Sequence, residues 1–375
     1  MRKLRKLPIA RRAGAILLAT VVLALTAGTV TAATASTQVA STQAASAPTI
    51  IAAGNDSVIA LDGPGNSLRL YWAARGSSTW HEETVAGAST TYSNPSVAWD
   101  GSGLVIAAEG YQGSIEFYSG TLGSAAWRHQ TIQRKFTSYH APSVAVSDGT
   151  VVIAAAGAQG TVEFYWATVG SPVWHHHTIA PKFTTYETPS VAVSGGTVVI
   201  AASGAQETLE YYWGTAGSSA WHHQTIQRKF KTYAAPSVAV SGDTVVIAVS
   251  GFQGTLEFYW ATVGSVVWHH HTIAPKFTTD NAPSVAVSGD RVDVAAQGYQ
   301  DTLEFYWGTV GSVTWGHHTI AAKFTTNAGP SLMLDNGEAD VATAGPGYRL
   351  DLFWSTNGTT SWHPQEIAPP GTVSA

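Results

Sequence analysis

One unit of 47 residues, repeated seven times, constrains the possible fold of this chain more than any other feature. Each unit opens on a proline, and serine follows that proline in every unit but the first. These prolines are Pro48, Pro95, Pro142, Pro189, Pro236, Pro283 and Pro330. A tryptophan recurs at the same interval, as Trp80, Trp127, Trp174, Trp221, Trp268, Trp315 and Trp362. Because no copy carries an insertion or a deletion, we expect equivalent places in one architecture and no separate catalytic domain.

Each unit contains four strand signals separated by turn signals. In the third unit the expected strands are 142–147, 150–157, 161–168 and 174–180. The second is a continuous apolar run, which is typical of a strand covered on both faces. The third alternates, so that Phe164 and Trp166 share one face while Glu163 and Tyr165 share the other. A repeated four-stranded antiparallel meander of 47 residues predicts an all-β protein, a seven-bladed β-propeller.

The residues before the first unit predict an exported protein. Six basic residues precede an apolar run and a string of small residues, which indicates a cleaved signal peptide over 1–35. A Ser/Thr/Ala/Gln-rich stretch, 36–47, is expected to be a disordered tether. The blades are then predicted over 48–94, 95–141, 142–188, 189–235, 236–282, 283–329 and 330–375. We therefore expect a secreted, extracellular protein without membrane insertion after signal cleavage; an uncleaved anchor is the alternative.

Composition limits the possible partners. After the leader, 13 Lys and Arg stand against 24 Asp and Glu, a net charge of −11, which argues against nucleic acid or an anionic membrane as partner. The chain has no cysteine, so disulfides and thiolate metal sites are excluded. Its aromatic content suits a large packed core.

A meander also predicts which loops lie together. The turn between the second and third strands should share a face of the disc with the connection to the next blade, 180–188 in the third unit. That face carries the longer and more varied loops, so we expect any binding there or in the clefts between blades.

The strand sequences also carry a family resemblance. The order Pro-Ser-Val-Ala, RVDVAAQG (291–298), TLEFYWG (302–308) and a Trp-led fourth strand resembles the PLL-like bacterial propeller lectins. The resemblance implies sugar binding in pockets between blades, and no binding residue is transferred by position. The chain is also similar to tandem repeat regions of secreted actinobacterial proteins.

Four sets of residues are candidates for ligand binding. Glutamines in the turn after the second strand can donate and accept hydrogen bonds, or can satisfy the turn backbone instead. Carboxylates and tyrosines on the third strand could recognise sugar hydroxyls, with a solvated strand edge or an internal hydrogen bond as the alternative. Lysines lie in the connection between blades. The candidates are Gln112, Gln159, Gln206, Gln253 and Gln300; Glu163, Glu210, Glu257 and Glu304; Tyr165, Tyr212, Tyr259 and Tyr306; and Lys182, Lys229, Lys276 and Lys323.

Two other interpretations, a metal site and a catalytic motif, have less support in the sequence. His175 and His177 should point to one face of their strand, as should His269 and His271, and such pairs can hold a transition metal. The other units offer only His-Gln, His-Glu or Gly-His there, so packed or solvated imidazoles are favoured, and we predict no metal and no cofactor. The chain also lacks a Gly-x-Ser-x-Gly elbow, a P-loop and an HExxH motif.

Seven near-copies favour multivalent binding over the single asymmetric constellation that catalysis needs. The sequence therefore predicts a non-enzymatic, lectin-like binding module whose partner is a glycan or cell-surface polysaccharide. A structural or protein-interaction scaffold at the cell envelope is the alternative, and a glycoside-active enzyme is a distant third.

Overall fold

The computed structural model describes residues 47–374, apart from 125, 135–137, 139, 182–183, 186, 229–233, 277 and 357–359. The predicted signal peptide (1–35) and all but the last residue of the predicted tether (36–47) lie outside the described residues. Apart from one short 3-10 turn, η1 (Pro346–Tyr348), every regular element described is a β-strand. None of the described segments forms a helix with the length and apolarity needed to cross a bilayer.

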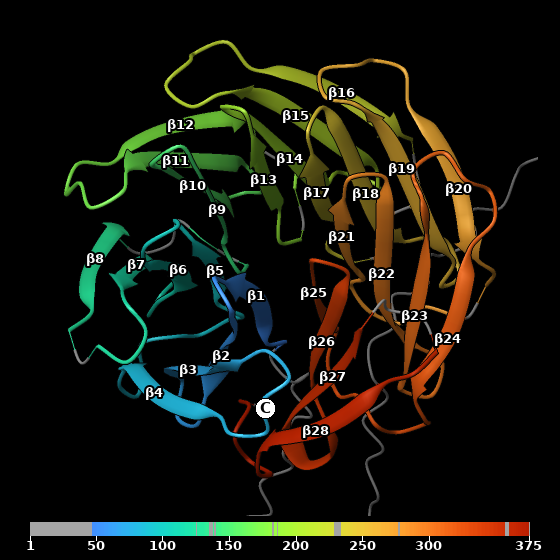
Figure 1. Ribbon diagram of the computed structural model, residues 1–375. Coiled ribbons are helices and arrows are strands. Elements are labelled where there is room, and N and C mark those ends of the chain that lie inside the picture. The colour runs from blue at the N-terminus through green and yellow to red at the C-terminus, as the bar shows by residue number, and fades with distance from the viewer. Residues whose placement is uncertain are drawn as a thin grey trace, which may run out of the picture. The chain divides into compact units, whose positions relative to one another are not determined.

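Seven four-stranded antiparallel sheets form the blades of a β-propeller, which confirms the predicted fold (Figure 1). Blade 1 comprises β1 (Thr49–Ala53), β2 (Asp56–Gly63), β3 (Ser67–Ala74) and β4 (His81–Ala86). Blade 2 comprises β5 (Ser96–Trp99), β6 (Leu104–Glu109), β7 (Ile115–Gly120) and β8 (Arg128–Gln133). Blade 3 comprises β9 (Ser143–Ser147), β10 (Thr150–Ala156), β11 (Val162–Thr168) and β12 (His175–Ala180).

The remaining blades repeat this layout. Blade 4 comprises β13 (Ser190–Ser194), β14 (Thr197–Ser203), β15 (Leu209–Thr215) and β16 (His222–Gln227). Blade 5 comprises β17 (Ser237–Ser241), β18 (Thr244–Ser250), β19 (Leu256–Thr262) and β20 (His269–Ala274). Blade 6 comprises β21 (Ser284–Ser288), β22 (Arg291–Gly298), β23 (Thr302–Thr309) and β24 (Gly316–Ala321). Blade 7 comprises β25 (Ser331–Asp335), β26 (Glu338–Ala344), β27 (Leu350–Thr356) and β28 (His363–Ala368).

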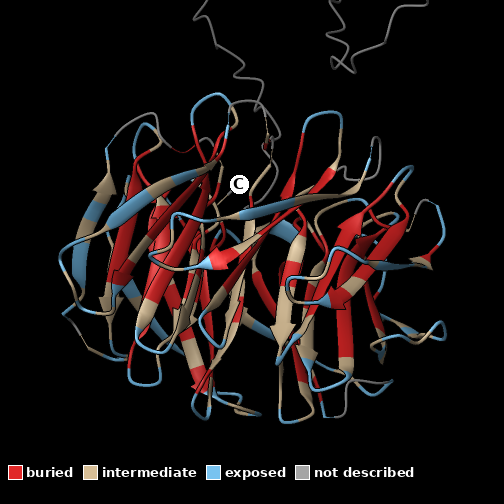
Figure 2. Ribbon diagram, turned by 90° about the horizontal axis from the view of Figure 1, so that it is seen from above, coloured by how far each residue is buried: buried red, intermediate tan, exposed pale blue. Residues whose placement is uncertain are grey.

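The hydrophobic core consists of clusters between neighbouring blades. Figure 2 shows the buried strand residues in red. Ile153 of β10 and Tyr165 of β11 face blade 2, where they pack with Phe117. Phe164, also in β11, faces blade 4, where it packs with Tyr212. Both faces of β10 are therefore covered, which explains why its sequence is a continuous apolar run rather than an alternating one.

The recurring tryptophan joins each blade to the one before it. Trp221 of blade 4 meets Phe164 of blade 3 edge to face, with ring centroids 4.8 Å apart. Similar pairs join Trp174 to Phe117, Trp268 to Tyr211, Trp315 to Phe258 and Trp362 to Phe305. Edge-to-face pairs at this separation are favourable in addition to the area they bury.

The serine after each proline has a structural role at the centre of the ring. The backbone N–H of Val191 in blade 4 donates to the Ser143 hydroxyl of blade 3 over 3.1 Å. The same bond links the innermost strands of other neighbouring blades, through Ser96, Ser190, Ser237, Ser284 and Ser331. Blade 1 has Thr49 at this position, and its hydroxyl donates to the Pro95 carbonyl instead.

The ring closes without exchanging a strand between its first and last blades. Each sheet is built from four consecutive strands, including blade 1 (β1–β4) and blade 7 (β25–β28). The backbone N–H of Ser374 donates to the backbone carbonyl of Asp62 in blade 1 at 2.8 Å. The backbone N–H of Asn327, in the connection from blade 6, donates to the carbonyl of Ala344 in blade 7 in the same way. The segment after β28 thus meets blade 1 in the way that a connection meets the next blade.

The predicted grouping of loops is confirmed. In blade 3, the N–H groups of Thr184 and Thr185 in the connection donate to the carbonyl of Gly160 in the glutamine-bearing turn. Thr278 and Thr279 donate to Gly254 in the same way in blade 5. Connection and turn therefore form one face of the propeller.

Candidate functional site

A polar cluster ties the third strand of a blade to the fourth. In blade 3, one carboxylate oxygen of Glu163 lies 2.6 Å from His176 Nε2 and accepts from the Thr178 hydroxyl at 2.7 Å. Its other oxygen accepts from the Thr161 hydroxyl at 2.5 Å. The carboxylate is buried, while the imidazole side chain is 45% exposed. The cluster therefore presents a held histidine ring to solvent.

Two local features of the backbone make room for this cluster. The register of β11 against β12 shifts between Val162 and Glu163, so that Glu163 lies opposite Thr178 and near His176. Gly157 precedes the turn, and a Cβ there would come within 2.3 Å of the Thr161 hydroxyl oxygen and 2.6 Å of Glu163 Cγ. A larger residue at 157 would displace the cluster, which explains the glycine.

The same polar cluster recurs in blades 2 to 6, which we call the middle blades. Its carboxylate and imidazole pairs are Glu116–His129, Glu163–His176, Glu210–His223, Glu257–His270 and Glu304–His317. Burial acts to raise the pKa of Glu163, Glu210 and Glu257, but hydrogen bonds from the histidine and the two threonines outweigh it. The net effect lowers the pKa of these three carboxyls, so they are ionised at neutral pH.

The candidate tyrosines lie beside this cluster and form part of the core. Tyr165, Tyr212, Tyr259 and Tyr306 are at most 5% exposed. The cluster histidine stacks on each ring, with centroids 4.6 Å apart for Tyr165 and His176. Burial is the main cause that raises the pKa of each of these hydroxyls far above its usual range. The tyrosines therefore support the histidine rather than stand free.

In blade 2 the polar cluster opens into a cleft of about 660 Å³. One wall is formed by Ser89 and Thr90 of the connection that leaves blade 1. The opposite wall carries Glu116, Tyr118 and His129, together with Tyr111 from the turn between β6 and β7. This cleft lies between two blades and opens on the face that carries the longer loops.

The glutamines lie at the tips of their turns with left-handed backbones. Their φ angles run from 59° at Gln112 to 62° at Gln159, a region that disfavours residues other than glycine. Gln112, Gln159, Gln206 and Gln253 are exposed. Of the lysines, Lys276 and Lys323 are exposed, and Lys276 Nζ lies 5.9 Å from the Phe252 ring centroid. Lys182 and Lys229 lie outside the described residues.

The structure changes the interpretation of the histidine runs. His175 stacks on Trp166 at 5.2 Å, while the middle residue, His176, binds a carboxylate. The carboxylate comes from Glu163 on the neighbouring strand, a partner that the sequence analysis did not assign to these runs. Within the described part of the chain, no group of three or more histidine and carboxylate side chains could hold a metal ion.

Sequence reasoning missed the cluster histidines, as well as Glu116 and Tyr118 in blade 2. A signal was available: the five units with glutamate on the third strand are the same five that have histidine thirteen positions later. Blades 1 and 7, which we call the closing blades, have neither. Such joint variation indicates contact between the two positions.

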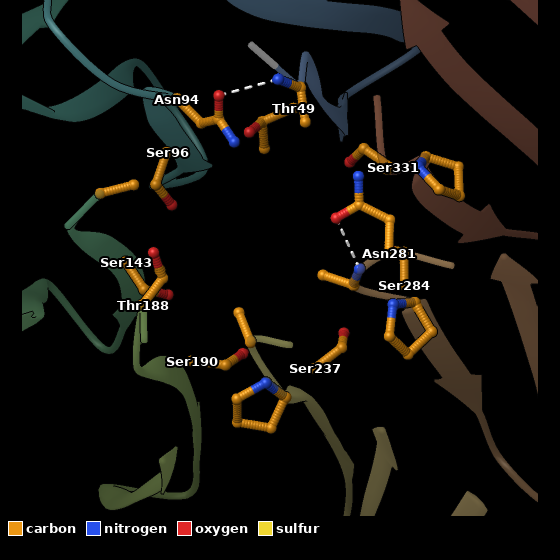
Figure 3. Close-up of a pocket in the computed structure, with 18 of the residues that line it drawn as sticks. Thr49, Asn94, Ser96, Ser143, Thr188, Ser190, Ser237, Asn281, Ser284 and Ser331 are labelled. Atoms are coloured by element: carbon orange, nitrogen blue, oxygen red, sulfur yellow. Dashed lines mark hydrogen bonds between the residues drawn. The ribbon is translucent and has the colours of Figure 1, made fainter. Parts of the chain in front are cut away.

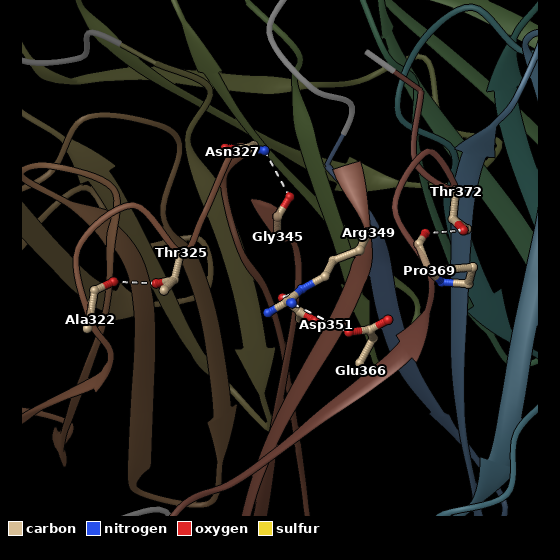
Figure 4. A network of polar contacts seen from close by, with 9 residues as sticks. All are labelled: Ala322, Thr325, Asn327, Gly345, Arg349, Asp351, Glu366, Pro369 and Thr372. Carbon is tan, nitrogen blue, oxygen red and sulfur yellow. Dashed lines mark hydrogen bonds and ion pairs between the residues drawn. The ribbon is translucent and has the colours of Figure 1, made fainter. Parts of the chain in front are cut away.

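The closing blades replace the cluster with arginine–carboxylate pairs. In blade 1, Arg69 takes the glutamate position and Glu82 the histidine position, with Nη1 and Oε1 2.9 Å apart. In blade 7, Arg349 pairs with Asp351 at 2.8 Å and with Glu366 at 3.4 Å (Figure 4). These pairs present guanidinium groups where the middle blades present imidazoles.

A second cavity, of about 410 Å³, lies at the centre of the ring (Figure 3). It is lined by the proline and serine of successive units, with Asn94 and Asn281 between them. The serine hydroxyls accept inter-blade backbone hydrogen bonds, and the Asn94 side chain accepts from the Ala47 N–H. These groups serve to join blades, so the inter-blade clefts are the stronger candidate sites.

Comparison with solved structures shows several propellers of the same fold. The BP39L lectin from Burkholderia pseudomallei aligns over 87% of this chain and 100% of its own, with a TM-score of 0.76 and 17% identity. The six-bladed fucose-recognising lectin of Aleuria aurantia aligns over 74% and 95%, with a TM-score of 0.53 and 12% identity. The propeller domain of the Trilobed protease from Pyrococcus furiosus aligns over 87% and 99%, with a TM-score of 0.52 and 9% identity.

The predicted relationship to propeller lectins is therefore supported at the level of fold, while the PLL-like family itself and the actinobacterial repeats stay predictions. No curated protein sequence matches the chain. A profile of the family described as outer membrane protein assembly factor BamB matches residues 111–337, from the turn of blade 2 to the start of blade 7. Because that match spans more than half of the chain, the protein belongs to this family of repeat proteins.

Proposed function

We propose that this protein is a secreted, non-catalytic, multivalent carbohydrate-binding propeller. The observation that carries the proposal is the fivefold repetition of one polar cluster with a half-exposed imidazole, which in blade 2 lines a cleft. Several weak sites on one rigid body raise avidity toward a polysaccharide that displays repeated sugars. Lectins among the proteins of similar fold support the same function.

The cluster has the chemistry for recognising hydroxyl groups. In the neutral ring, donation of His176 Nε2–H to the ionised Glu163 leaves Nδ1 as an acceptor for a sugar hydroxyl. The tyrosine beneath stacks on the ring, and the two threonines hold the carboxylate that binds it. A pre-oriented polar group in a partly apolar cleft is typical of small-ligand sites.

Binding to a panel of neutral glycosides and polysaccharides, followed by calorimetry, tests the proposal. Replacing the five cluster histidines with alanine should abolish binding. A control variant replaces His175, His222 and His269, which stack on tryptophans outside the cluster, and should bind normally. Histidine resonances of the unmodified protein provide a second test, since those of the cluster should shift on adding sugar. Failure of every glycan to bind would reject the proposal.

Family membership favours a second candidate, a protein-assembly scaffold at the cell envelope. This candidate is supported by the match of residues 111–337 to the family described as outer membrane protein assembly factor BamB. Fluorescence anisotropy of a labelled, unfolded outer-membrane protein would test this function. Saturable binding that glycans do not displace, together with no glycan retention, would favour the scaffold.

A further inference from the structure

The residue before each turn glutamine divides the middle blades into two groups. Blades 2, 5 and 6 have an aromatic residue there: Tyr111, Phe252 and Tyr299. Blades 3 and 4 have Ala158 and Ala205 at the same position. The polar cluster is present in both groups, so it does not account for this division.

The three aromatic side chains are exposed although most large apolar residues are buried. Tyr111 and Tyr299 are each 60% exposed, and Phe252 is 43% exposed. Scattered apolar residues on a surface need no explanation, but the same turn position in three blades is not scattered. An aromatic side chain repeatedly placed in solvent at one turn position is typical of a contact residue for a ligand or partner.

The fold of the turn does not require an aromatic residue. The glutamine that follows has φ of 59°, 60° and 61° after Tyr111, Phe252 and Tyr299. It has φ of 62° and 61° after Ala158 and Ala205. The backbone is therefore the same with either residue, and alanine suffices to build the turn.

Blade 2 shows where such an aromatic ring lies relative to the polar cluster. Tyr111 lines the same cleft as Glu116 and His129. A second ring, Tyr92 of the preceding connection, lies 6.0 Å from Tyr111 and is tilted against it. The cleft thus combines an exposed aromatic surface with a fixed imidazole.

These two elements match the two surfaces of a pyranose. One face of many pyranoses presents C–H groups, which pack on an aromatic ring, and its edge presents hydroxyls, which need polar partners. We propose that blades 2, 5 and 6 are the sugar-binding blades, with Tyr111, Phe252 and Tyr299 as stacking platforms for a neutral pyranose. Blades 3 and 4 keep the polar cluster but lack the platform, and bind about tenfold more weakly. This inference rests on the proposed carbohydrate binding.

Substituting alanine at the three positions tests the inference without disturbing the fold. The variant Tyr111→Ala/Phe252→Ala/Tyr299→Ala gives each turn the Gly-Ala-Gln sequence that blades 3 and 4 already have. The reverse variant, Ala158→Tyr/Ala205→Tyr, adds the missing platforms. Probes are methyl α-fucoside, methyl α-mannoside and methyl β-galactoside, with the number of sites and the affinity measured by calorimetry.

The unmodified protein should bind a responsive glycoside at three sites. The triple alanine variant should lose affinity about tenfold while its melting temperature stays unchanged, and the tyrosine variant should gain two sites. Five equal sites in the unmodified protein, or undiminished binding by the triple variant, would overturn this inference and leave carbohydrate binding intact. If the unmodified protein binds no glycan, carbohydrate binding itself is wrong and the inference fails with it.

Discussion

The middle blades and the closing blades use the same backbone for different purposes. In the middle blades, a glutamate on the third strand holds a half-exposed histidine on the fourth. In the closing blades those positions carry Arg69 and Glu82, or Asp351 and Pro364. The contact between blades 7 and 1, which we call the seam, adds a buried hydroxyl–carboxylate pair to an apolar cluster. The difference teaches that the closing pair departs from the repeat both in these surface pairs and in a buried polar contact across the seam.

The seam contains a buried polar pair at two positions that are both apolar between blades 2 and 3. The Ser57 hydroxyl of blade 1 donates to Asp340 of blade 7 at 2.7 Å, and Asp340 is 1% exposed. Between blades 2 and 3 the equivalent residues are Val105 and Val151, which pack in the inter-blade core. Arg75 also forms an ion pair with Asp335 across the seam.

The largest expected effect comes from breaking the seam pair. Ser57→Val leaves the buried Asp340 carboxylate without its donor and should lower the free energy of unfolding by about 2–4 kcal/mol. The double variant Ser57→Val/Asp340→Val recreates the apolar contact of the middle blades and should recover most of that loss. Denaturation by guanidinium measures both. A double variant less stable than Ser57→Val alone would show that the seam needs its polar pair.

The seam should also respond to pH. Burial raises the pKa of Asp340 to about 6 in the folded protein, above the unfolded value of 3.8. The folded protein therefore binds this proton more tightly than the unfolded chain does. The stabilisation from this proton is fully present below about pH 4 and is lost as the pH rises through 6. Relative to Asp340→Asn, the unmodified protein should lose on the order of 2 kcal/mol between pH 4 and 7. Parallel stability profiles of the two proteins would contradict this expectation.

Exchanging charges in a middle blade sharpens the comparison further. Glu163→Arg removes the acceptor for Thr161, Thr178 and His176, and should cost about 1–2 kcal/mol of stability. Glu163→Arg/His176→Glu imitates the Arg69–Glu82 pair of blade 1 and should restore much of this loss. Thermal unfolding measures both variants. If the double variant is no more stable than the single one, the two kinds of blade differ in more than these side chains.

The smallest effect concerns the turn glutamine. The closing blades have Gly65 and Gly347 at the position of Gln159, with φ of 67° and 71°. Gln159→Gly removes the cost of holding a residue with a side chain in the left-handed backbone conformation. It also increases the conformational entropy of the unfolded chain, which opposes that gain. The net change in the free energy of unfolding should lie between zero and about 1 kcal/mol of stabilisation. A clear loss of stability would mean that the Gln159 side chain supports the turn.

Most of the architecture could be predicted because it depends on short-range pattern. The interval between prolines fixed seven equivalent units, and alternation along 161–168 placed Glu163 and Tyr165 on one face. The meander also grouped the connections with the glutamine turns. The candidate site was predicted less well. Glu163 and Tyr165 were named as candidates, but the sequence analysis considered His175 and His177 and did not name His176, which contacts both.

The sequence by itself determined the repeat, the strands and the loop face, since hydrophobic periodicity and turn residues act within one unit. Only the tertiary structure decided which side chains meet. The shift in register at Val162 and Glu163 brings the carboxylate to His176, and a shift of one residue would send that carboxylate elsewhere. Ring closure decided that Ser57 meets Asp340, 283 residues away in the chain. Such contacts depend on how whole blades pack, and no pattern within a single unit specifies them.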